Sequence, residues 1–263
     1  MTEHEKLKNA PLVLVVAQIN FSPVEDIETH IPAIQAKFKE QGYPYFDDKH
    51  PLQEITVTQG VGIQINGTKQ WFFINKKKTV SIALTKNMLA VNTADYTTFR
   101  VFLPVVENVL KIITDELSLE KYNALEQVSL RYVDHVRPIG GKKPEELIKA
   151  EFLGGFAQDE TVQLRQVLIE RKTDVGVARF VVFKPFESQT VLADIQATGL
   201  NFGNMEKDSP CIVLDMGHVK KMLGEDFNQL QIMDTFRNLH QEVDDFFFKQ
   251  IPTEEALKLW KGE

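Results

Sequence analysis

Cysteine is almost absent from the sequence, which contains Cys211 alone among its 263 residues. A single thiol cannot build an intramolecular disulfide framework, and it cannot form a metal site made only of cysteines. Tryptophan and tyrosine are also scarce, at 2 and 5 residues, whereas phenylalanine contributes 18. We therefore expect a phenylalanine-rich core and a reducing compartment, the cytoplasm.

Long hydrophobic runs are missing as well. No uninterrupted apolar stretch approaches the roughly 20 residues that a membrane-spanning helix needs. The first residues of the chain, 1–9, are polar and charged, and they lack the apolar segment of a secretory signal peptide. The sequence thus predicts a soluble protein without a membrane partner.

Positive charge is in deficit, because 30 lysines and arginines face 37 aspartates and glutamates, for a net charge of -7. General nucleic-acid binders are usually basic, so this balance argues against a nucleic-acid partner. The sequence has no Walker A, HExxH or CxxC motif, and Gly60-x-Gly62 lacks the third glycine of a dinucleotide-binding loop. We therefore predict no cofactor and no bound metal.

The clearest pattern that is present lies in residues 79–138, where apolar residues first alternate, then recur at steps of three and four, then alternate again. Such a sequence predicts a strand, a tight turn, a strand, a long helix and a strand. The expected bounds are 80–85 and 89–93 for the first two strands, 96–117 for the helix and 128–136 for the last strand. Pro104 lies well inside the helix, and it predicts a kink or a short break there.

The same patterns predict the remaining elements. We expect strands at 11–21, 53–59, 70–75, 161–171, 177–183, 191–202 and 211–216, and helices at 28–41, at 145–151, and after residues 226 and 252. The expected helix caps are Thr29, Asp226 and Thr253, and residues 43–51 show no regular pattern. The buried stripe of the helix after residue 226 should consist of Phe227, Leu230, Met233, Phe236, Leu239, Val243 and Phe247.

The chain divides into a polar arm (1–10), a first half (11–138), a glycine-containing linker (139–144) and a second half (145–263). Each half is expected to contain an antiparallel meander followed by a long helix. We therefore predict an α+β fold of two similar halves, with an internal duplication, in which helices pack on one face of the sheet. The other face should be polar, covered by a ligand or paired with another subunit.

Several short stretches carry a resemblance to a known family. They are Pro11-Leu12, Gln18-Ile19-x-Phe21, Tyr96 with Phe99, Arg131-Tyr132-Val133, Leu214-Asp215, His240, and residues 246–251 followed by Thr253 and Trp260. Over nearly its whole length the chain resembles a sporadically distributed family of uncharacterised bacterial and archaeal proteins. The resemblance implies the domain layout above, and it implies no reaction.

The candidate binding site is a cluster on the strand at 128–136. Arg131, His135 and Arg137 share one face of this strand at a period of two, whereas Asp134 points the other way. Two guanidinium groups beside an imidazole suit an anion or a carboxylate. The alternative interpretation is a solvated sheet face with cross-strand pairs to acidic neighbours.

Three weaker candidates involve other polar residues. Asp215 and His218, with Asp134 or His135, could ligate a metal, although no ligand spacing supports it. His240 and Asp244 lie one helical turn apart, as in half of an acid–base pair or in an ordinary surface pair. Cys211 could be a nucleophile, but a cysteine in an apolar strand is more often a small buried hydrophobe.

The sequence favours a non-catalytic binding or protein-interaction module with an unidentified ligand or protein partner, and symmetric dimerisation is the default expectation. One alternative is a hydrolase or phosphate-handling enzyme that uses Arg131, His135 and Arg137. Another is a nucleic-acid-associated host-defence component. That alternative needs the lysines at 76–78, 142–143 and 220–221 on one continuous surface.

Overall fold

The computed structural model describes residues 7–49, 54–56, 64–66, 69–154, 165–184, 198–202 and 210–263. The strands are β1 (Leu12–Phe21), β2 (Tyr45–Lys49), β3 (Glu54–Thr56), β4 (Gln64–Asn66), β5 (Gln70–Ile74), β6 (Val80–Thr85), β7 (Met88–Thr93), β8 (Ala124–Val136), β9 (Arg165–Lys172), β10 (Val177–Lys184) and β11 (Ile212–Asp226). The helices are α1 (Ile27–Glu40), α2 (Phe99–Leu117), α3 (Leu119–Tyr122), α4 (Pro144–Leu147), the 3-10 turn η1 (Ala150–Phe152), α6 (Gln229–Gln250) and α7 (Glu254–Lys261).

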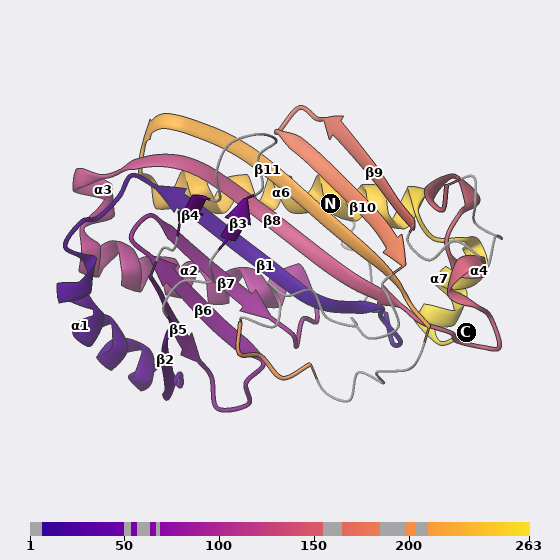
Figure 1. The fold of residues 1–263 in the computed structure, drawn as a ribbon, viewed down its shortest axis with the longest axis horizontal. Coiled ribbons are helices and arrows are strands. Elements are labelled where there is room, and N and C mark those ends of the chain that lie inside the picture. Colours follow the sequence, from indigo (N-terminus) through magenta and orange to yellow (C-terminus); the bar gives the residue numbers. More distant parts are fainter. Residues whose placement is uncertain are drawn as a thin grey trace.

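Nine strands form one antiparallel sheet in the order β2-β5-β6-β7-β1-β8-β11-β10-β9. The long helices α2 and α6 lie behind this sheet in Figure 1, and the main hydrophobic core fills the space between the helices and the strands. The mixed helix and strand content confirms the predicted α+β class. Among the described residues, no helix combines the length and the hydrophobicity needed to cross a membrane.

β1 lies at the centre of the sheet, between β7 and β8. Its nearly continuous apolar run predicts a strand that is buried on both faces. Val15 packs into the main core on the helix side, while its neighbour Leu14 packs with Val133, Cys211 and Val213 on the opposite side. Both residues are buried, which confirms the prediction.

The long helices follow their predicted apolar stripes, with corrections at the ends. α2 continues through Pro104 as one helix, so the predicted short break does not occur. α6 begins after Asn228, whose side chain accepts a hydrogen bond from the Gln231 N–H, so Asp226 is not the cap. Because the helix starts later than expected, Leu230 is 77% exposed, and Ile232 takes the buried place.

Of the other two predicted caps, one is confirmed and one is wrong. Thr253 caps α7 as predicted, since its side chain accepts a hydrogen bond from the Ala256 N–H. Thr29 was the wrong cap for α1, because the helix begins after Asp26 and the Thr29 hydroxyl donates to the Asp26 carbonyl. A first turn that offers several capping side chains does not specify which one is used.

The strands also depart from the predicted bounds. Residues 45–49, expected to be irregular, form the edge strand β2, which pairs with β5. β11 is much longer than the predicted strand at 211–216. The prediction ends too early because the second half of β11 is mostly exposed and carries a register shift between Lys221 and Glu225, so it lacks a clear apolar alternation. Of the predicted strand at 191–202, only residues 198–202 are described, and they are not a strand.

The predicted halves share this one sheet. β8, from the first half, pairs with β11, from the second, in a register that runs from Val136 opposite Ile212 to Ala124 opposite Asp226. Within the predicted linker, Ile139 and Lys142 form an isolated bridge, and Lys142 lies 3.3 Å from Glu255 of α7.

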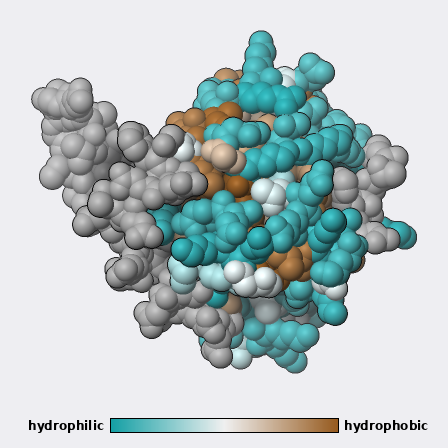
Figure 2. Space-filling view, turned by 90° about the vertical axis from the view of Figure 1, so that its right-hand side faces the viewer, coloured by the Kyte–Doolittle hydropathy of each residue, from teal (hydrophilic) through white to brown (hydrophobic). Residues whose placement is uncertain are grey.

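The turn of α4 and the helix α7 lie together at the end of the molecule that contains this linker (Figure 1). Viewed from this end, the surface is mainly hydrophilic, with apolar side chains showing between the polar ones (Figure 2).

Candidate functional site

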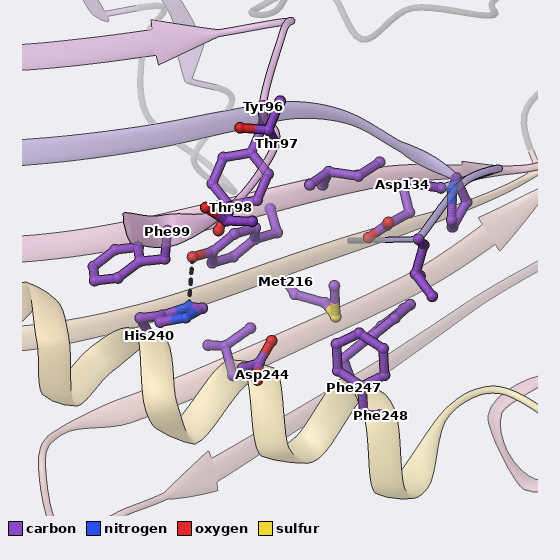
Figure 3. A pocket seen from close by; sticks show the side chains of 16 residues that line it. Tyr96, Thr97, Thr98, Phe99, Asp134, Met216, His240, Asp244, Phe247 and Phe248 are labelled. Atoms are coloured by element: carbon purple, nitrogen blue, oxygen red, sulfur yellow. Dashed lines mark hydrogen bonds between the residues drawn. The ribbon is translucent and has the colours of Figure 1, made fainter. Parts of the chain in front are cut away.

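A cavity of about 110 Å³ lies between the sheet and α6, beside the first residue of α2. Five parts of the chain form its wall: the N-terminal segment 7–12, the segment 96–99, strand β8, strand β11, and the second half of α6. Figure 3 shows their side chains converging on one space. These parts lie far apart in the sequence, so the cavity exists only in the folded chain.

Local periodicity decides which side chains reach the cavity. On β8, alternation places Tyr132 and Asp134 on the side that faces the helices. On α6, steps of three and four residues align His240, Asp244 and Phe247 along the facing side of the helix.

The N-terminal segment closes one side of the cavity. The Asn9 backbone N–H donates to the Trp260 carbonyl at 2.8 Å, and its side-chain amide donates to the Leu259 carbonyl at 3.0 Å. Leu7, 9% exposed, packs into the main core. These contacts hold the segment against α7, with Ala10 exposed at the mouth of the cavity.

One end of the cavity is a group of interacting aromatic rings. The Tyr132 hydroxyl shares a hydrogen bond of 2.9 Å with His240 Nδ1 (Figure 3). Phe99 stacks on the His240 ring at a centroid distance of 4.0 Å, and Tyr96 meets the Tyr132 ring edge to face at 5.9 Å. Burial, and then the nearby Tyr96 and Asp244, raise the pKa of Tyr132 well above its ordinary value, so the phenol stays protonated.

Asp134 supplies a buried carboxyl group to the same cavity. The residue is 3% exposed, and among the described residues its Oδ2 atom has no hydrogen-bond partner. Burial, followed by the charge of Asp215 on the neighbouring strand, raises the pKa of Asp134 to about 8. At neutral pH this group is therefore mostly a carboxylic acid, which is how a buried carboxyl avoids the penalty of an unpaired charge.

The predicted site at Arg131, His135 and Arg137 lies on the opposite side of β8. Arg131 makes a bidentate ion pair with Asp215 on β11, with Nε to Oδ1 and Nη2 to Oδ2 both at 2.7 Å. This geometry matches the cross-strand pairing that the sequence left open as the alternative interpretation. An anion could use these two donor atoms only by displacing Asp215.

His135 is buried beside Arg137 and, among the described residues, neither ring nitrogen has a hydrogen-bond partner. Burial, and then the charge of Arg137, lower the pKa of His135 to about 4, so the ring is neutral at physiological pH. Burial also raises the pKa of the Cys211 thiol, a change that Arg137 opposes. Cys211 packs with apolar residues as a small hydrophobe.

His218 and Asp215 lie on opposite faces of β11 and cannot share a metal ion. His218 Nδ1 donates to the Leu239 carbonyl at 3.2 Å, and Nε2 lies 2.9 Å from the Thr173 hydroxyl. Both ring nitrogens thus join β11 to neighbouring elements. In the part of the chain that the structure describes, no group of three or more metal-ligating side chains occurs.

The lysines noted in the sequence do not line this cavity. Lys76 and Lys77 line an open groove of about 370 Å³, which shares Tyr96 and Thr97 with the wall of the cavity, and Lys142 is paired with Glu146 and Glu255. Gly60-x-Gly62 lies outside the described residues. The proposed continuous lysine surface stays a prediction.

The sequence predicts some of the residues of this site but not their meeting. The spacing of His240 and Asp244, one turn apart, predicts them as a candidate pair, and alternation along β8 predicts the side of the sheet on which Asp134 lies. The sequence does not join Tyr132 and Asp134 to that pair, because the packing of β8 against α6 depends on contacts such as Tyr132–His240, 108 residues apart. The available signal was polar Asp134 at a helix-facing position among apolar residues at 128, 130 and 136.

The cavity therefore combines apolar walls, a Tyr–His pair and a buried carboxyl group. Such a composition suits the recognition of a small molecule with one polar end. Comparison of the sequence with known proteins finds no protein-family model and no curated protein that matches this chain, so the resemblance noted above stays a prediction.

Proposed function

We propose that the protein is a non-catalytic binding protein of the cytoplasm, and that the cavity beside Asp134 holds a small, mainly apolar molecule with one polar end. The observation that carries this proposal is Asp134, a residue 3% exposed that lines a cavity of about 110 Å³ and whose Oδ2 atom has no hydrogen-bond partner among the described residues. Buried polar atoms in native proteins are nearly always satisfied by protein, water or ligand.

The dimensions limit the ligand. An apolar cavity of about 150 Å³ is known to accept benzene, so the present cavity suits about five non-hydrogen atoms. Leu12, Met216 and Val243 supply apolar contact along the walls. The rest of a larger ligand would extend through the open mouth near Ala10.

The alternative enzyme function has less support. A hydrolase or phosphate-handling enzyme at Arg131, His135 and Arg137 needs an anion at Arg131, and that anion would compete with the bidentate contact from Asp215. The sheet position of these residues also separates them from the Tyr132–His240 pair on the helix side.

The proposal is tested with three four-carbon probes, butan-1-ol, butylamine and butyrate, by following thermal unfolding of the full chain. We expect at least one probe to raise Tm, with a dissociation constant on the order of 1 mM, given the few atoms that can make contact. Native mass spectrometry of the purified chain reports any retained ligand together with the oligomeric state, for which a homodimer is expected.

Two matched variants locate the binding. Ala10→Phe places a ring at an exposed position in the mouth of the cavity, so it should block the probes without unfolding the protein. Leu230→Phe adds the same ring at a position of α6 that is 77% exposed and away from the cavity, and it should bind like the wild type. If no probe stabilises the wild type, or if Ala10→Phe binds unchanged, the cavity is not the site.

We also propose that the two meander–helix units are copies of one ancestral unit. The order β5-β6-β7-α2 in the first half is repeated as β9-β10-β11-α6 in the second. In both units a long helix follows the last strand of the meander directly in the sequence.

A further inference from the structure

We propose that the ligand of this cavity is an organic cation, a primary or methylated amine on a short apolar body, whose charged nitrogen is received by Asp134. This inference rests on the proposed binding function and names the chemical class of the ligand. It follows from the charges that face the cavity, from the state of the Asp134 carboxyl group, and from the aromatic walls.

Two carboxyl groups line the cavity. Asp134 contributes from β8 and Asp244 from α6, while none of the described residues that line the cavity is a lysine or an arginine. Figure 3 shows these two carboxyl groups on different sides of the same space. An anionic ligand would find no lysine or arginine among these residues to pair with, whereas a cation can pair with Asp134 once that carboxyl group ionises.

Asp134 has a hydrogen-bonding need that an ammonium group meets. Its Oδ2 atom has no partner among the described residues, and the side chain is almost fully buried. An ammonium group brings N–H donors and a positive charge, so it satisfies the oxygen and pairs the charge in one contact. A neutral alcohol would satisfy the oxygen without the charge-assisted gain.

Aromatic rings form much of the remaining wall. Tyr96, Tyr132 and Phe247 all line the cavity, and Tyr96 meets Tyr132 edge to face. Ring faces attract cations, and aromatic cages are a recurring means of binding methylated ammonium groups. The apolar body of the ligand would lie along Met216 and Val243.

Protonation links this binding to pH. The titratable groups that line the cavity with Asp134 are Tyr132 on its own strand, Asp244 and His240 on α6, and Tyr96 before α2; Asp215 on β11 lies on the opposite face of the sheet and acts through its charge. Burial and Asp215 raise its pKa to about 8, so the empty cavity holds a carboxylic acid at pH 7. When the ammonium binds, the carboxyl group ionises, its proton passes to the solvent, and the ammonium keeps its own protons.

The test compares the same three probes by isothermal titration calorimetry. We expect butylamine to bind the wild type at least tenfold more tightly than butan-1-ol, and butyrate to bind most weakly. At pH 7 nearly one proton is released to the buffer for each butylamine bound. The binding enthalpies measured in phosphate and in Tris should therefore differ by nearly the full difference between the ionisation enthalpies of the two buffers. At pH 9.5 this difference should fall close to zero, because Asp134 is then already ionised.

The variant Asp134→Asn keeps the shape of the carboxylic acid. We expect it to lose at least tenfold in butylamine affinity, to release no proton, and to keep its affinity for butan-1-ol. If the variant does not fold, the proton count on the wild type still decides the question.

Butan-1-ol that binds as tightly as butylamine, or butylamine that binds without proton release at pH 7, overturns the cation inference and leaves the binding function standing. Failure of all three probes, in the wild type and in Leu230→Phe alike, overturns the binding function itself. Tetramethylammonium, which has no N–H donor, separates the aromatic contribution from the hydrogen bond, since its binding at comparable strength would overturn the role given to Oδ2.

Discussion

Asp134 and His135 are neighbours on β8, and they face opposite sides of the sheet. Both side chains are 3% exposed, and both have polar atoms without a partner among the described residues. Their pKa values move in opposite directions, to about 8 for Asp134 and to about 4 for His135. In each case burial is the largest cause, because it disfavours the charged form of an acid and of a base alike.

The surroundings of the two residues differ. Asp134 lines a cavity of about 110 Å³, whereas His135 lines neither that cavity nor the groove beside Lys76. On its side of the sheet, His135 lies near a small apolar cluster that contains Val133 and Val213. An unsatisfied polar atom points to a ligand where space exists for one. Where apolar side chains fill the space, it is a source of instability.

The largest expected effect is on the helix side, in Asp134→Asn. The folded protein keeps the Asp134 proton up to pH of about 8, whereas the unfolded chain releases it near 3.8. This group therefore lowers the free energy of unfolding as pH rises through that window, by about 1.4 kcal/mol per pH unit. Between pH 5 and pH 7 the wild type should lose about 3 kcal/mol relative to the variant.

Urea denaturation at pH 5, 6, 7 and 8 measures this difference, and any contribution from His135 cancels between the two proteins. Asp234→Asn, at a residue 71% exposed on α6, is the matched control and should follow the wild-type profile. Parallel profiles for the wild type and Asp134→Asn would mean that the Asp134 carboxyl group is ionised in the folded protein.

The next effect is on the opposite side, in Arg131→Ala. Removing the guanidinium leaves the Asp215 carboxylate, 19% exposed, without its bidentate partner. We expect a loss of about 2 kcal/mol in the free energy of unfolding, because a partly buried charge is left unpaired. The double variant with Asp215→Ala should recover part of this loss, which gives a coupling energy of about 1 kcal/mol.

Arg237→Ala breaks an exposed pair with Asp234 and serves as the control, with an expected loss below about 0.5 kcal/mol. A neutral effect of Arg131→Ala would contradict a structural role for the pair. The anion-binding interpretation of Arg131 would then regain support.

The sequence predicted this two-sided strand more fully than it predicted the cavity. Alternation along β8 assigned Arg131 and His135 to one face and Asp134 to the other, because a period of two is a property of the extended backbone itself. Burial on the Arg131 side was not predicted. The charged composition suggested solvent, yet Arg131 is paired across to Asp215, and that contact depends on the register of β8 against β11.

The cavity depended on information that periodicity does not contain. The predicted pattern of α6 was shifted at its start, which placed exposed Leu230 in the core, but His240 and Asp244 further along kept their common face. Their meeting with Tyr132 requires the packing of α6 across β8, which local patterns do not determine. The length of β11 was missed for a similar reason, since Lys220 and Lys221 interrupt the apolar alternation while the backbone still pairs with β8.

A smaller effect is expected from His135→Leu. The unfolded chain binds a proton on this imidazole near pH 6.5, whereas the folded protein resists it down to pH of about 4. His135 thus contributes stability that is present above pH 6.5 and is lost as pH falls, by about 2 kcal/mol between pH 7 and pH 5. The leucine variant should lack this loss, and it should gain stability from removing two buried nitrogens without partners.

Chemical denaturation at pH 5 and pH 7 gives the comparison, with His30→Gln as the control at a histidine of α1 whose side chain is 33% exposed. Between pH 5 and pH 6.5 the two groups change the free energy of unfolding in opposite directions: His135 lowers it as pH falls, whereas Asp134 lowers it as pH rises. If both variants shift the pH profile in the same direction, burial is not the common cause of the two pKa changes.

The smallest effect, from Arg137→Gln, separates burial from charge. The Arg137 charge is the second cause of the lowered pKa of His135, and it is not a cause of the raised pKa of Asp134. Removing it should raise the pKa of His135 slightly, so the acid-induced loss of stability becomes smaller by a few tenths of a kcal/mol. The loss of stability caused by Asp134 between pH 5 and pH 8 should stay unchanged.

Cys211 gives a second measurement on the same variant. Arg137 lowers the pKa of this thiol against the larger opposite effect of burial, so Arg137→Gln should slow alkylation of the folded protein at pH 8. The urea-unfolded wild type and variant should react at equal rates, which is the control for intrinsic reactivity. Equal rates in the folded proteins as well would show that the positive charge does not reach this side of the sheet, and that burial alone holds His135 neutral.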